Sequence, residues 1–328
     1  MVSSAWGKIQ YKNHGARGLW RRIGSAGSLA YERLARTLAR FMGEMMDHMQ
    51  GLTDSTTLYN GVAMPWLGLG VWQAKDGEEV EQAVRASIEA GYRSIDTAAV
   101  YQNETGVGEG IRTAGVAREQ LFITTKVWNN RQGYESTLTA FEESRKKLGV
   151  EYVDLYLIHW AVKDKYRDTW RALEKLYEDG RVRAIGVSNF QAHHLQDLMT
   201  HFQVKPMVNQ VEYHPYLTQK ELLQFCKEHG IQLEAWSPLM RGGEIMDHPV
   251  IRELGEQYGK TPAQIVLRWD LEHGVVTIPK SIHEERIREN AAVFDFALTA
   301  AEISSIDALN QNRRSFAYDP DNVDFGLS

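Results

Sequence analysis

Short apolar runs alternate with longer amphipathic stretches along most of this chain, and no other sequence feature constrains its fold as strongly. Apolar strands separated by amphipathic helices are typical of a parallel sheet that is buried on both faces. Eight such runs follow residue 66, and we expect each to be a strand. They span residues 67–72, 93–98, 121–127, 153–159, 182–188, 207–212, 232–236 and 275–279.

The stretches between these runs carry apolar residues at helical spacing. Thr261-Pro262 predicts a helix start with proline at the first helical position. A glycine comes just after five of the helices, where a left-handed cap is favoured. The helices are predicted at 76–90, 134–148, 164–178, 191–200, 218–228 and 261–272, and the capping glycines are Gly91, Gly149, Gly180, Gly230 and Gly274.

Eight strand–helix units favour a closed (β/α)8 TIM barrel over an open doubly wound sheet. A barrel of this kind needs about 250 residues, so the 328 residues of the chain favour one large domain at 52–328. Residues 57–59 and 62–65 flank Asn60-Gly61, which predicts an N-terminal β-hairpin. We also expect extra C-terminal helices.

Two glycine-rich stretches do not fit a nucleotide-binding turn. Gly68-Leu69-Gly70 lacks the third glycine of the dinucleotide fingerprint, and residues 106–110 have the wrong spacing and follow a polar loop rather than a strand. No stretch resembles a Walker A loop. A nucleotide that binds this chain therefore does so by other means.

The first 51 residues differ from the rest in charge. They hold eight of the 37 Lys and Arg residues but only three of the 43 Asp and Glu residues, so their net charge is +5 and that of residues 52–328 is −11. We expect a basic extension outside the fold. It is an organelle transit peptide, a docking helix, or sequence upstream of the natural start; the last is favoured and would make it non-native.

Composition excludes several classes of protein. The net charge of −6 argues against nucleic acid as the main partner. The single cysteine, Cys226, excludes an internal disulfide and a cysteine-based zinc cluster. No apolar run approaches the roughly 20 residues of a membrane span, and no secretory signal is evident. We expect a cytoplasmic protein with no membrane partner.

Charged and polar side chains close several of the apolar strands. Asp96, Lys126 and His159 each end a different strand, and Tyr101 follows shortly after Asp96. Burying such groups unpaired costs several kcal/mol. The strand ends of a barrel converge on one mouth, where active sites of this fold lie, so there the groups can pair.

The chemistry of these four residues follows from their pairing. Asp96 and Lys126 can form a buried ion pair. A tyrosine beside the lysine ammonium is expected to have a pKa below its usual value of about 10, which would make Tyr101 a usable general acid. His159 can donate a hydrogen bond to a substrate oxygen and orient it.

No metal site is expected. The histidines lack ligand spacing, and His193-His194 are adjacent on a predicted helix, so we expect them to point to different faces. A serine hydrolase is also disfavoured, because no G-x-S-x-G stretch occurs.

These residues, in this order, resemble the aldo-keto reductase family over about residues 56–310, and most of all its compact bacterial members that reduce glyoxal, methylglyoxal or 2,5-diketo-gluconate. Several long motifs carry the resemblance. They are Gly91-Tyr92-Arg93-Ser94-Ile95-Asp96-Thr97-Ala98 with Tyr101 and Asn103-Glu104, Lys126, Val153–Trp160, Ile185–Phe190, Asn209–Glu212, and Ile278-Pro279-Lys280-Ser281 with Arg286, Glu289 and Asn290.

The resemblance implies a catalytic tetrad of Asp96, Tyr101, Lys126 and His159, with Tyr101 as the proton donor. It also implies NADPH (as NADP+ after oxidation) lying across the barrel mouth. The implied contacts are Ser188, Asn189 and Gln210 to the carboxamide, Trp236 to the nicotinamide face, Ser237, Pro238 and Leu239 along the pyrophosphate, Lys280, Ser281 and Arg286 to the 2′-phosphate, and Glu289 and Asn290 to the adenine.

The 2′-phosphate assignment has a rationale of its own. Two cations and a hydroxyl make a phosphate site, and the arginine guanidinium is suited to bidentate phosphate contact. NADPH is therefore favoured over NADH.

The resemblance also implies a substrate pocket walled by Trp72, Trp128 and Trp160, with Asn129 nearby. Relatives often have proline where this chain has Ala161, which puts the shape of one loop in doubt. The segment after the seventh strand is short and the tail after residue 309 is modest. A small, fairly open pocket suits small aldehydes, dicarbonyls and keto-sugars.

The activity implied is NADPH-dependent carbonyl reduction by a monomer. Oxidation as the main direction stays open, because the same site runs both ways. A non-catalytic NADPH-binding regulatory subunit on the same fold is the first alternative. A metal-dependent barrel hydrolase is the second.

Overall fold

The computed structural model describes residues 49–322 of the chain. The predictions for residues 1–48, which make up most of the basic extension, lie outside these residues. The described residues belong to one compact unit that begins at Met49.

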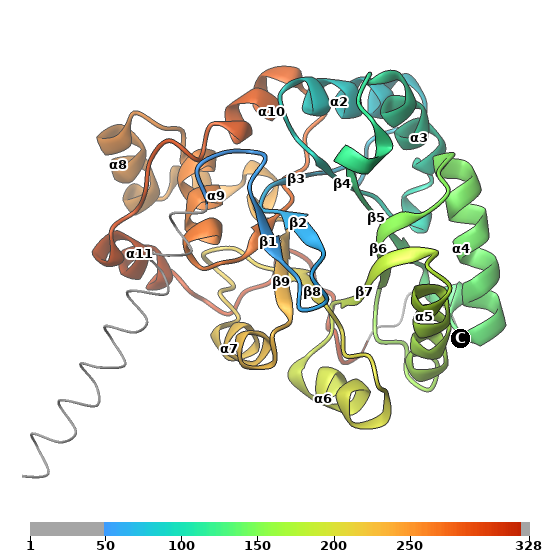
Figure 1. The fold of residues 1–328 in the computed structure, drawn as a ribbon. Coiled ribbons are helices and arrows are strands. Elements are labelled where there is room, and N and C mark those ends of the chain that lie inside the picture. Colours follow the sequence, from blue (N-terminus) through green and yellow to red (C-terminus); the bar gives the residue numbers. More distant parts are fainter. Residues whose placement is uncertain (1–48, 323–328) are drawn as a thin grey trace, which may run out of the picture. The chain divides into compact units, whose positions relative to one another are not determined.

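Eight parallel strands form the barrel that the apolar runs predict (Figure 1). Each strand pairs in parallel with the next along the chain, and two single bridges, Leu67 to Thr277 and Gly70 to Lys280, join the last strand to the first. All eight predicted strands are therefore confirmed. They are β3 (Gly68–Gly70), β4 (Ser94–Asp96), β5 (Phe122–Val127), β6 (Val153–Ile158), β7 (Val182–Ser188), β8 (Val208–Glu212), β9 (Gln232–Trp236) and β10 (Val276–Thr277).

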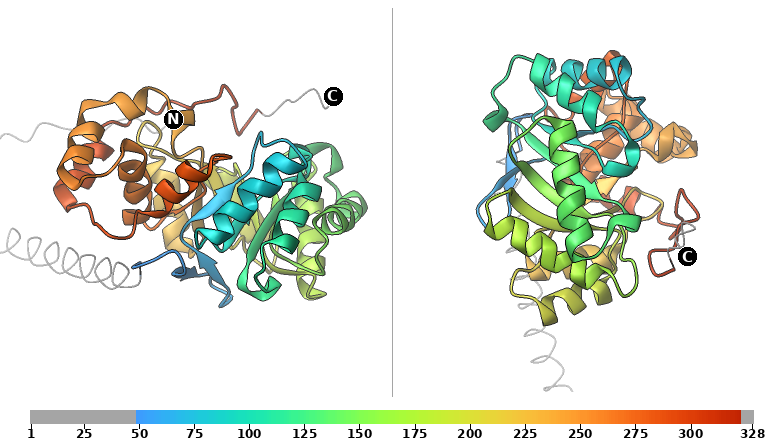
Figure 2. Two further views of the ribbon diagram at one scale, coloured as in Figure 1. Left: turned by 90° about the horizontal axis from the view of Figure 1, so that it is seen from above. Right: turned by 90° about the vertical axis from the view of Figure 1, so that its right-hand side faces the viewer.

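Helices surround the barrel (Figure 2). The six predicted helices are present as α2 (Glu78–Glu89), α4 (Tyr134–Leu148), α5 (Tyr166–Glu178), α6 (Ala192–His201), α7 (Lys220–His229) and α9 (Pro262–Glu272). Two further helices, α3 (Glu104–Thr113) and α8 (Pro249–Tyr258), were not predicted, whereas α10 (Glu284–Ala291) and α11 (Ala300–Asp307) are the extra C-terminal helices that we expected. Short 3₁₀ turns lie at Ala99–Tyr101, Arg118–Gln120, Asn129–Arg131, Met240–Gly242 and Glu244–Asp247.

The helix boundaries follow local chemistry. Thr261 caps α9, because its hydroxyl accepts a hydrogen bond from the backbone of Gln264 while the Gln264 side chain accepts one from the backbone of Thr261. The five glycines predicted to cap helices all have positive φ angles. Among residues 49–322, no helix combines the length and the apolar composition that crossing a membrane requires.

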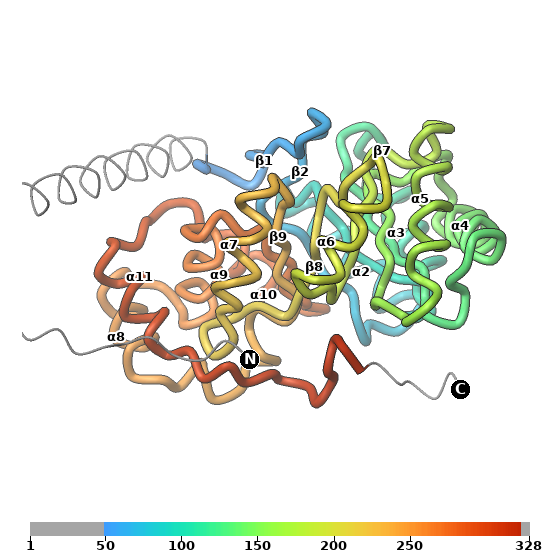
Figure 3. The backbone as a smooth tube through the Cα atoms, turned by 90° about the horizontal axis from the view of Figure 1, so that it is seen from below, coloured from blue at the N-terminus to red at the C-terminus, as the bar shows by residue number. Residues whose placement is uncertain are grey.

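The predicted hairpin is present as β1 (Ser55–Thr57) and β2 (Ala63–Pro65). Its turn is longer than the Asn60-Gly61 pair indicates, because the Leu58 amide pairs with the Val62 carbonyl and leaves a three-residue loop with Gly61 at φ +87°. Residues 58, 59 and 62 were predicted within the strands. Residue 59 lies in this loop, and residues 58 and 62 flank it just outside β1 and β2. The hairpin and the C-terminal segment lie at opposite ends of the barrel (Figure 3).

The glycine-rich stretch 106–110, for which we predicted no secondary structure from the sequence, forms part of α3. Its glycines allow close packing of this helix. A Cβ atom on Gly106 would lie 2.5 Å from Val80 of α2, and one on Gly110 would lie 2.8 Å from Val84. A Cβ on Gly108 would collide with the backbone of Leu148 at the end of α4. The run therefore serves helix packing rather than phosphate binding.

We predict that Gly108→Ala destabilises the fold, because the atoms it would meet are backbone and cannot rotate away. Overpacking of this kind costs about 1–3 kcal/mol. Thr105→Ala, at an exposed position of the same helix, is the matched control and should not lower stability. Urea unfolding measures both free energies, and equal values would show that α3 tolerates the added methyl group.

Candidate active site

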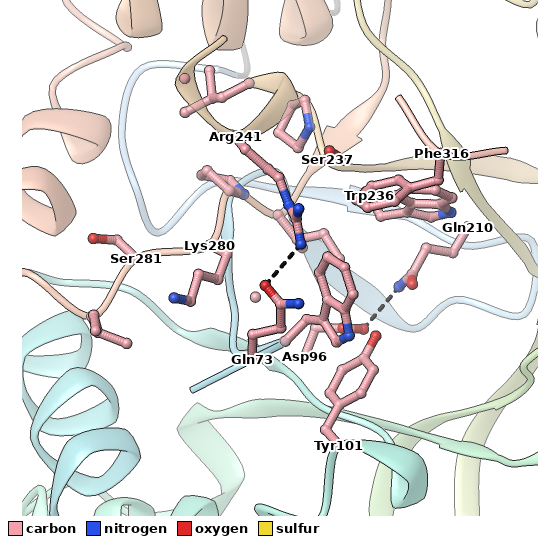
Figure 4. A pocket seen from close by; sticks show the side chains of 18 of the residues that line it. Gln73, Asp96, Tyr101, Gln210, Trp236, Ser237, Arg241, Lys280, Ser281 and Phe316 are labelled. Atoms are coloured by element: carbon pink, nitrogen blue, oxygen red, sulfur yellow. Dashed lines mark hydrogen bonds between the residues drawn. The ribbon is translucent and has the colours of Figure 1, made fainter. Parts of the chain in front are cut away.

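A cavity of about 930 Å³ opens at the carboxyl ends of the barrel strands. Every site residue predicted from the sequence lines this cavity except Lys126, which has no exposed surface and lies behind Asp96. Figure 4 shows side chains from several strands and loops pointing into it. The structure thus brings the whole predicted set together, although the role of each residue stays a prediction.

Asp96 and Lys126 form the buried ion pair that we predicted. The Nζ atom of Lys126 lies 2.6 Å from Oδ1 of Asp96 and 2.9 Å from the carbonyl oxygen of Thr97. Burial raises the pKa of Asp96 against the opposing effect of Lys126. Burial lowers the pKa of Lys126, but Asp96 and Tyr101 act against it and the pKa ends above its usual value. The lysine is therefore held as a cation.

Tyr101 ends a 3₁₀ turn that follows β4 and lies beside this ion pair. The Nζ atom of Lys126 is 5.1 Å from the centroid of the tyrosine ring. The prediction that the pKa of Tyr101 falls below its usual value is wrong for this structure. Burial raises the pKa of Tyr101 more than Lys126 lowers it. The phenol therefore keeps its proton at neutral pH.

His159 faces Tyr101 from the end of β6. Its ring lies edge-on to the Tyr101 ring at 5.8 Å and to the Trp128 ring at 5.0 Å, measured between centroids. Burial and the Lys126 charge hold the pKa of His159 well below its usual value. The imidazole is therefore neutral, and a neutral ring carries one N–H that can donate a hydrogen bond.

Asn189 links the centre of the pocket to its neighbours. Its amide nitrogen donates to the carbonyl of His159 at 3.1 Å and to the hydroxyl of Ser188 at 3.0 Å. Its amide oxygen accepts from the indole nitrogen of Trp236 at 2.9 Å. This hydrogen bond fixes the Trp236 ring in place. Asn189 and Ser237 both have positive φ angles, of 61° and 53°, so the backbone turns sharply where their strands end.

Glu234 is a functional candidate to which the sequence reasoning gave no role. It lies on β9 with no exposed surface, and its Oε2 atom accepts from Nε2 of Gln210 at 2.7 Å. Nε2 of Gln210 also donates to Oδ2 of Asp96 at 2.8 Å. The available signal was an acidic residue inside an apolar strand, two positions before Trp236.

The far end of the cavity is basic. Lys280 and Arg286 are exposed and form no ion pair with a carboxylate among residues 49–322. Ser281 is buried, and its hydroxyl bonds to the backbone of His283. Glu289 accepts from the hydroxyl of Thr261 at 2.8 Å. Two cations without partners beside a hydroxyl are the donor set that a phosphate needs.

Aromatic rings wall the other end, and two come from the tail that we expected to be modest. Phe316 contacts Trp72 edge-on at 5.3 Å and Trp236 at 6.0 Å. Tyr318 meets Trp160 edge-on at 6.0 Å. The tail therefore forms part of the pocket wall, and no strand or helix period in the sequence could have indicated this.

Arg241 crosses the rim of the pocket and was also missed. Its guanidinium lies 5.0 Å from the Trp72 ring centroid and 4.8 Å from that of Phe316. It donates to the side-chain oxygen of Gln73 at 2.9 Å (Figure 4). The short segment after β9 is thereby joined to the loop after β3.

The prediction that His193 and His194 point to different faces of their helix is wrong. Their Nε2 atoms lie 3.1 Å apart, and Asp321 lies 3.2 Å from His193. However, the backbone N–H of Gln191 donates to Nδ1 of His194 at 3.2 Å. The proton of the neutral ring is then on Nε2, where a metal ligand needs a lone pair. The hydrogen bond between Gln191 and His194 serves to cap the N-terminus of α6.

Comparison with known proteins agrees with the resemblance inferred from the sequence motifs. The sequence profile of the Aldo/keto reductase family matches residues 66–244 and 246–311. Glyoxal reductase of Bacillus subtilis is 62% identical over 80% of this chain and 95% of its own length. Methylglyoxal reductase DkgA of Escherichia coli K12 is 49% identical over 80% of this chain and 96% of its own.

Solved structures also match the fold. A crystal structure of MGS-M4, described as an aldo-keto reductase from a Medee basin deep-sea metagenome library, superposes with a TM-score of 0.80 at 45% identity, covering 83% of this chain and all of the other. An aldo-keto reductase of Bombyx mori in complex with NADP superposes with a TM-score of 0.76 at 39% identity, covering 80% and 94% of the two chains.

Proposed function

The chain belongs to the aldo/keto reductase family, and from that membership we propose that it reduces small aldehydes, dicarbonyls or keto-sugars to alcohols with NADPH. The protein is an oxidoreductase that uses a nicotinamide cofactor. The observation that carries the proposal is the convergence of Asp96, Tyr101, Lys126 and His159 at one cavity. Its substrate class, its preference for NADPH and the role of each residue are the proposal.

In this proposal Tyr101 gives a proton to the carbonyl oxygen of the substrate. The bound cofactor supplies the hydride that the carbonyl carbon receives. The raised pKa of Tyr101 suits an acid that enters the reaction protonated, and the Lys126 ammonium stabilises the phenolate left behind. His159 donates its N–H to the substrate oxygen and orients it toward Tyr101.

The residues of the cavity fit NADPH. We propose that Ser188, Asn189 and Gln210 hold its carboxamide, and that the Trp236 ring lies along the nicotinamide. Trp236 is held by its hydrogen bond to Asn189, so its ring presents a fixed apolar face. Further contacts assigned to the cofactor are Ser237, Pro238 and Leu239 to the pyrophosphate, Lys280, Ser281 and Arg286 to the 2′-phosphate, and Glu289 and Asn290 to the adenine.

Small carbonyl substrates are supported by the relatives and by the pocket. Two relatives are named for glyoxal and methylglyoxal. The pocket wall is largely aromatic, from Trp72, Trp128, Trp160, Phe316 and Tyr318. Planar dicarbonyls and short aldehydes fit between such rings, while the Tyr101 phenol provides the polar group.

The alternative of a non-catalytic regulatory subunit would bind NADPH without turnover. A complete tetrad argues against it, and measuring NADPH oxidation with methylglyoxal distinguishes the two. Turnover that survives a metal chelator would also exclude the metal-dependent hydrolase.

We predict that Tyr101→Phe lowers kcat for methylglyoxal reduction by about 10²–10⁴-fold, because the hydroxyl that donates the proton is removed. The dissociation constant of NADPH, measured by the quenching of tryptophan fluorescence, should stay within about twofold of wild type, because Tyr101 is assigned to proton transfer and not to cofactor binding. Tyr166→Phe removes a phenol that bonds Asp197 outside the cavity and serves as the control. Near-normal turnover of Tyr101→Phe would remove Tyr101 as the acid.

We predict that Arg286→Ala weakens NADPH binding by about tenfold to a hundredfold, the loss expected for one charge-assisted hydrogen bond. NADH lacks the 2′-phosphate and should be affected little. Arg288→Ala, on the same helix but paired with Glu284, is the matched control. Equal weakening of both cofactors by Arg286→Ala would refute the 2′-phosphate assignment.

We further propose that residues 52–328 carry the activity as a monomer in the cytoplasm, with the preceding basic segment outside the functional fold. A truncated chain that lacks residues 1–51 should keep the kcat and KM of the full chain and elute as a monomer from a sizing column. An inactive or insoluble truncated protein would make the basic segment part of the functional fold.

A further inference from the structure

Glu234 is a buried carboxylate just beneath the floor of the active-site cavity. It has no exposed surface and is absent from the residues that line the cavity. Trp236 is two residues farther along β9, and side chains two apart in a strand point to the same face. Glu234 therefore lies one layer below Trp236, at the level of Gln210, its register partner on β8.

The contacts of Glu234 determine how Gln210 is oriented. Two carboxylates, Asp96 Oδ2 and Glu234 Oε2, lie 2.8 and 2.7 Å from Nε2 of Gln210. Asp96 is ionised in its pair with Lys126 and can only accept, so the amide nitrogen, which carries the hydrogens, is the atom that faces it. Gln210 lines the cavity, and its nitrogen points toward Asp96 (Figure 4). The amide oxygen is then the atom left for a ligand in the cavity.

Fold stability does not account for this carboxylate. Its second oxygen, Oε1, has no hydrogen-bond partner among residues 49–322. Burial of an ionisable group without full pairing costs several kcal/mol, and an apolar side chain at the same place would avoid that cost. A residue that the fold does not need in this form is a candidate for a role in the reaction.

The charges around Glu234 all belong to the catalytic machinery. The charges of Asp96 on β4 and Lys126 on β5 act on Glu234, and the Gln210 amide bridges Glu234 and Asp96. Burial and Asp96 raise the pKa of Glu234 to about 8, while Gln210 and Lys126 oppose the rise. Glu234 in turn is among the groups that raise the pKa of Lys126 and of Tyr101.

We propose that Glu234 is a positioning residue of the active site. With Asp96 it holds the Gln210 amide so that its oxygen faces the cofactor, and it places an ionisable carboxyl group next to the network of Gln210, Asp96 and Lys126. It acts through these neighbours and touches neither substrate nor cofactor. The proposal rests on the proposed function, in which Tyr101 is the proton donor.

The sign of the pH effect follows from the charges. Because burial raises the pKa of Glu234, its carboxyl group ionises only as the pH rises above the usual range of a glutamate. The ionised form disfavours a second negative charge on Tyr101. Reduction requires protonated Tyr101, so its rate falls on the alkaline side as Tyr101 ionises. Removing Glu234 should therefore move this alkaline limb to lower pH.

The test compares Glu234→Gln with Glu104→Gln. Glu104 is likewise a buried glutamate that accepts one hydrogen bond, from Thr125 at 2.7 Å, and its Oε2 has no partner among the described residues. It is not among the groups that shift the pKa of Tyr101 or Lys126. The two substitutions are thus matched in chemistry and burial, and only one touches the network.

Two quantities are measured on the full chain: kcat for methylglyoxal with NADPH from about pH 6 to about pH 10, and the dissociation constant of NADP+ from tryptophan fluorescence. Glu234→Gln should move the alkaline limb down by about 0.5–1 pH unit. It should also raise the dissociation constant of NADP+ by about threefold to tenfold, which corresponds to the loss of one hydrogen bond from the reoriented Gln210 amide. Glu104→Gln should leave both quantities at the wild-type values.

Glu234→Asp is a second variant in case Glu234→Gln does not fold. It keeps the carboxylate but withdraws it from Gln210 by one C–C bond, about 1.5 Å. Its alkaline limb should stay near that of wild type while NADP+ binds more weakly. Wild-type values of both quantities in Glu234→Gln, or a shifted limb in Glu104→Gln, would overturn the inference. If wild type reduces no carbonyl, the proposed function fails, and NADP+ affinity alone then decides whether Glu234 orients Gln210.

Discussion

A lysine ammonium with no exposed surface is tolerated only where opposite charge lies within hydrogen-bond distance, and this requirement organises the mouth of the barrel. Lys126 meets it through Asp96, at 2.6 Å. Asp96 in turn binds Gln210, and Gln210 binds Glu234, so four strands are joined through one polar chain. Tyr101 and His159 lie beside this chain, and their protonation states follow from its charges and its burial. The barrel buries these polar groups, and the ion pair with its hydrogen bonds offsets the free-energy cost of burying them.

The strands could be predicted from the sequence because each is a continuous apolar run, and eight of them leave few topologies to consider. Two helices, α3 and α8, were not predicted, and the C-terminal helices α10 and α11 were predicted without bounds. α3 contains three glycines, which weaken any helical pattern, yet these glycines let the helix pack against Val80 and Val84. Five of the eight residues of α10 are charged, and α8 and α11 are additional to the strand–helix repeat. α8 and α11 nevertheless carry local start signals, which are Pro249 at the first helical position and the Thr299–Glu302 capping box.

The tetrad could be predicted because each member ends a strand or follows one closely, and closure of a barrel brings all strand ends to one place. Residues on irregular segments had no such signal. Phe316, Tyr318 and Arg241 reach the pocket from the tail and from the loop after β9, whose paths no periodicity encodes. The pKa of Tyr101 was predicted with the wrong sign for a related reason: the neighbouring charge is visible in the sequence, but the cost of burial is not.

The acidic balance of the chain and its proposed anionic cofactor are compatible because the cavity separates its charges. Net charge −6 is an average over the whole chain, whereas Lys280 and Arg286 stand at the far end without carboxylate partners among residues 49–322. At the near end Asp96 lines the cavity and pairs with Lys126, and Glu234 is buried beneath the floor. The same burial also sets the state of the proposed proton donor. Burial raises the pKa of Tyr101 more than Lys126 lowers it, so the phenol rests as the acid, which is the form that carbonyl reduction consumes.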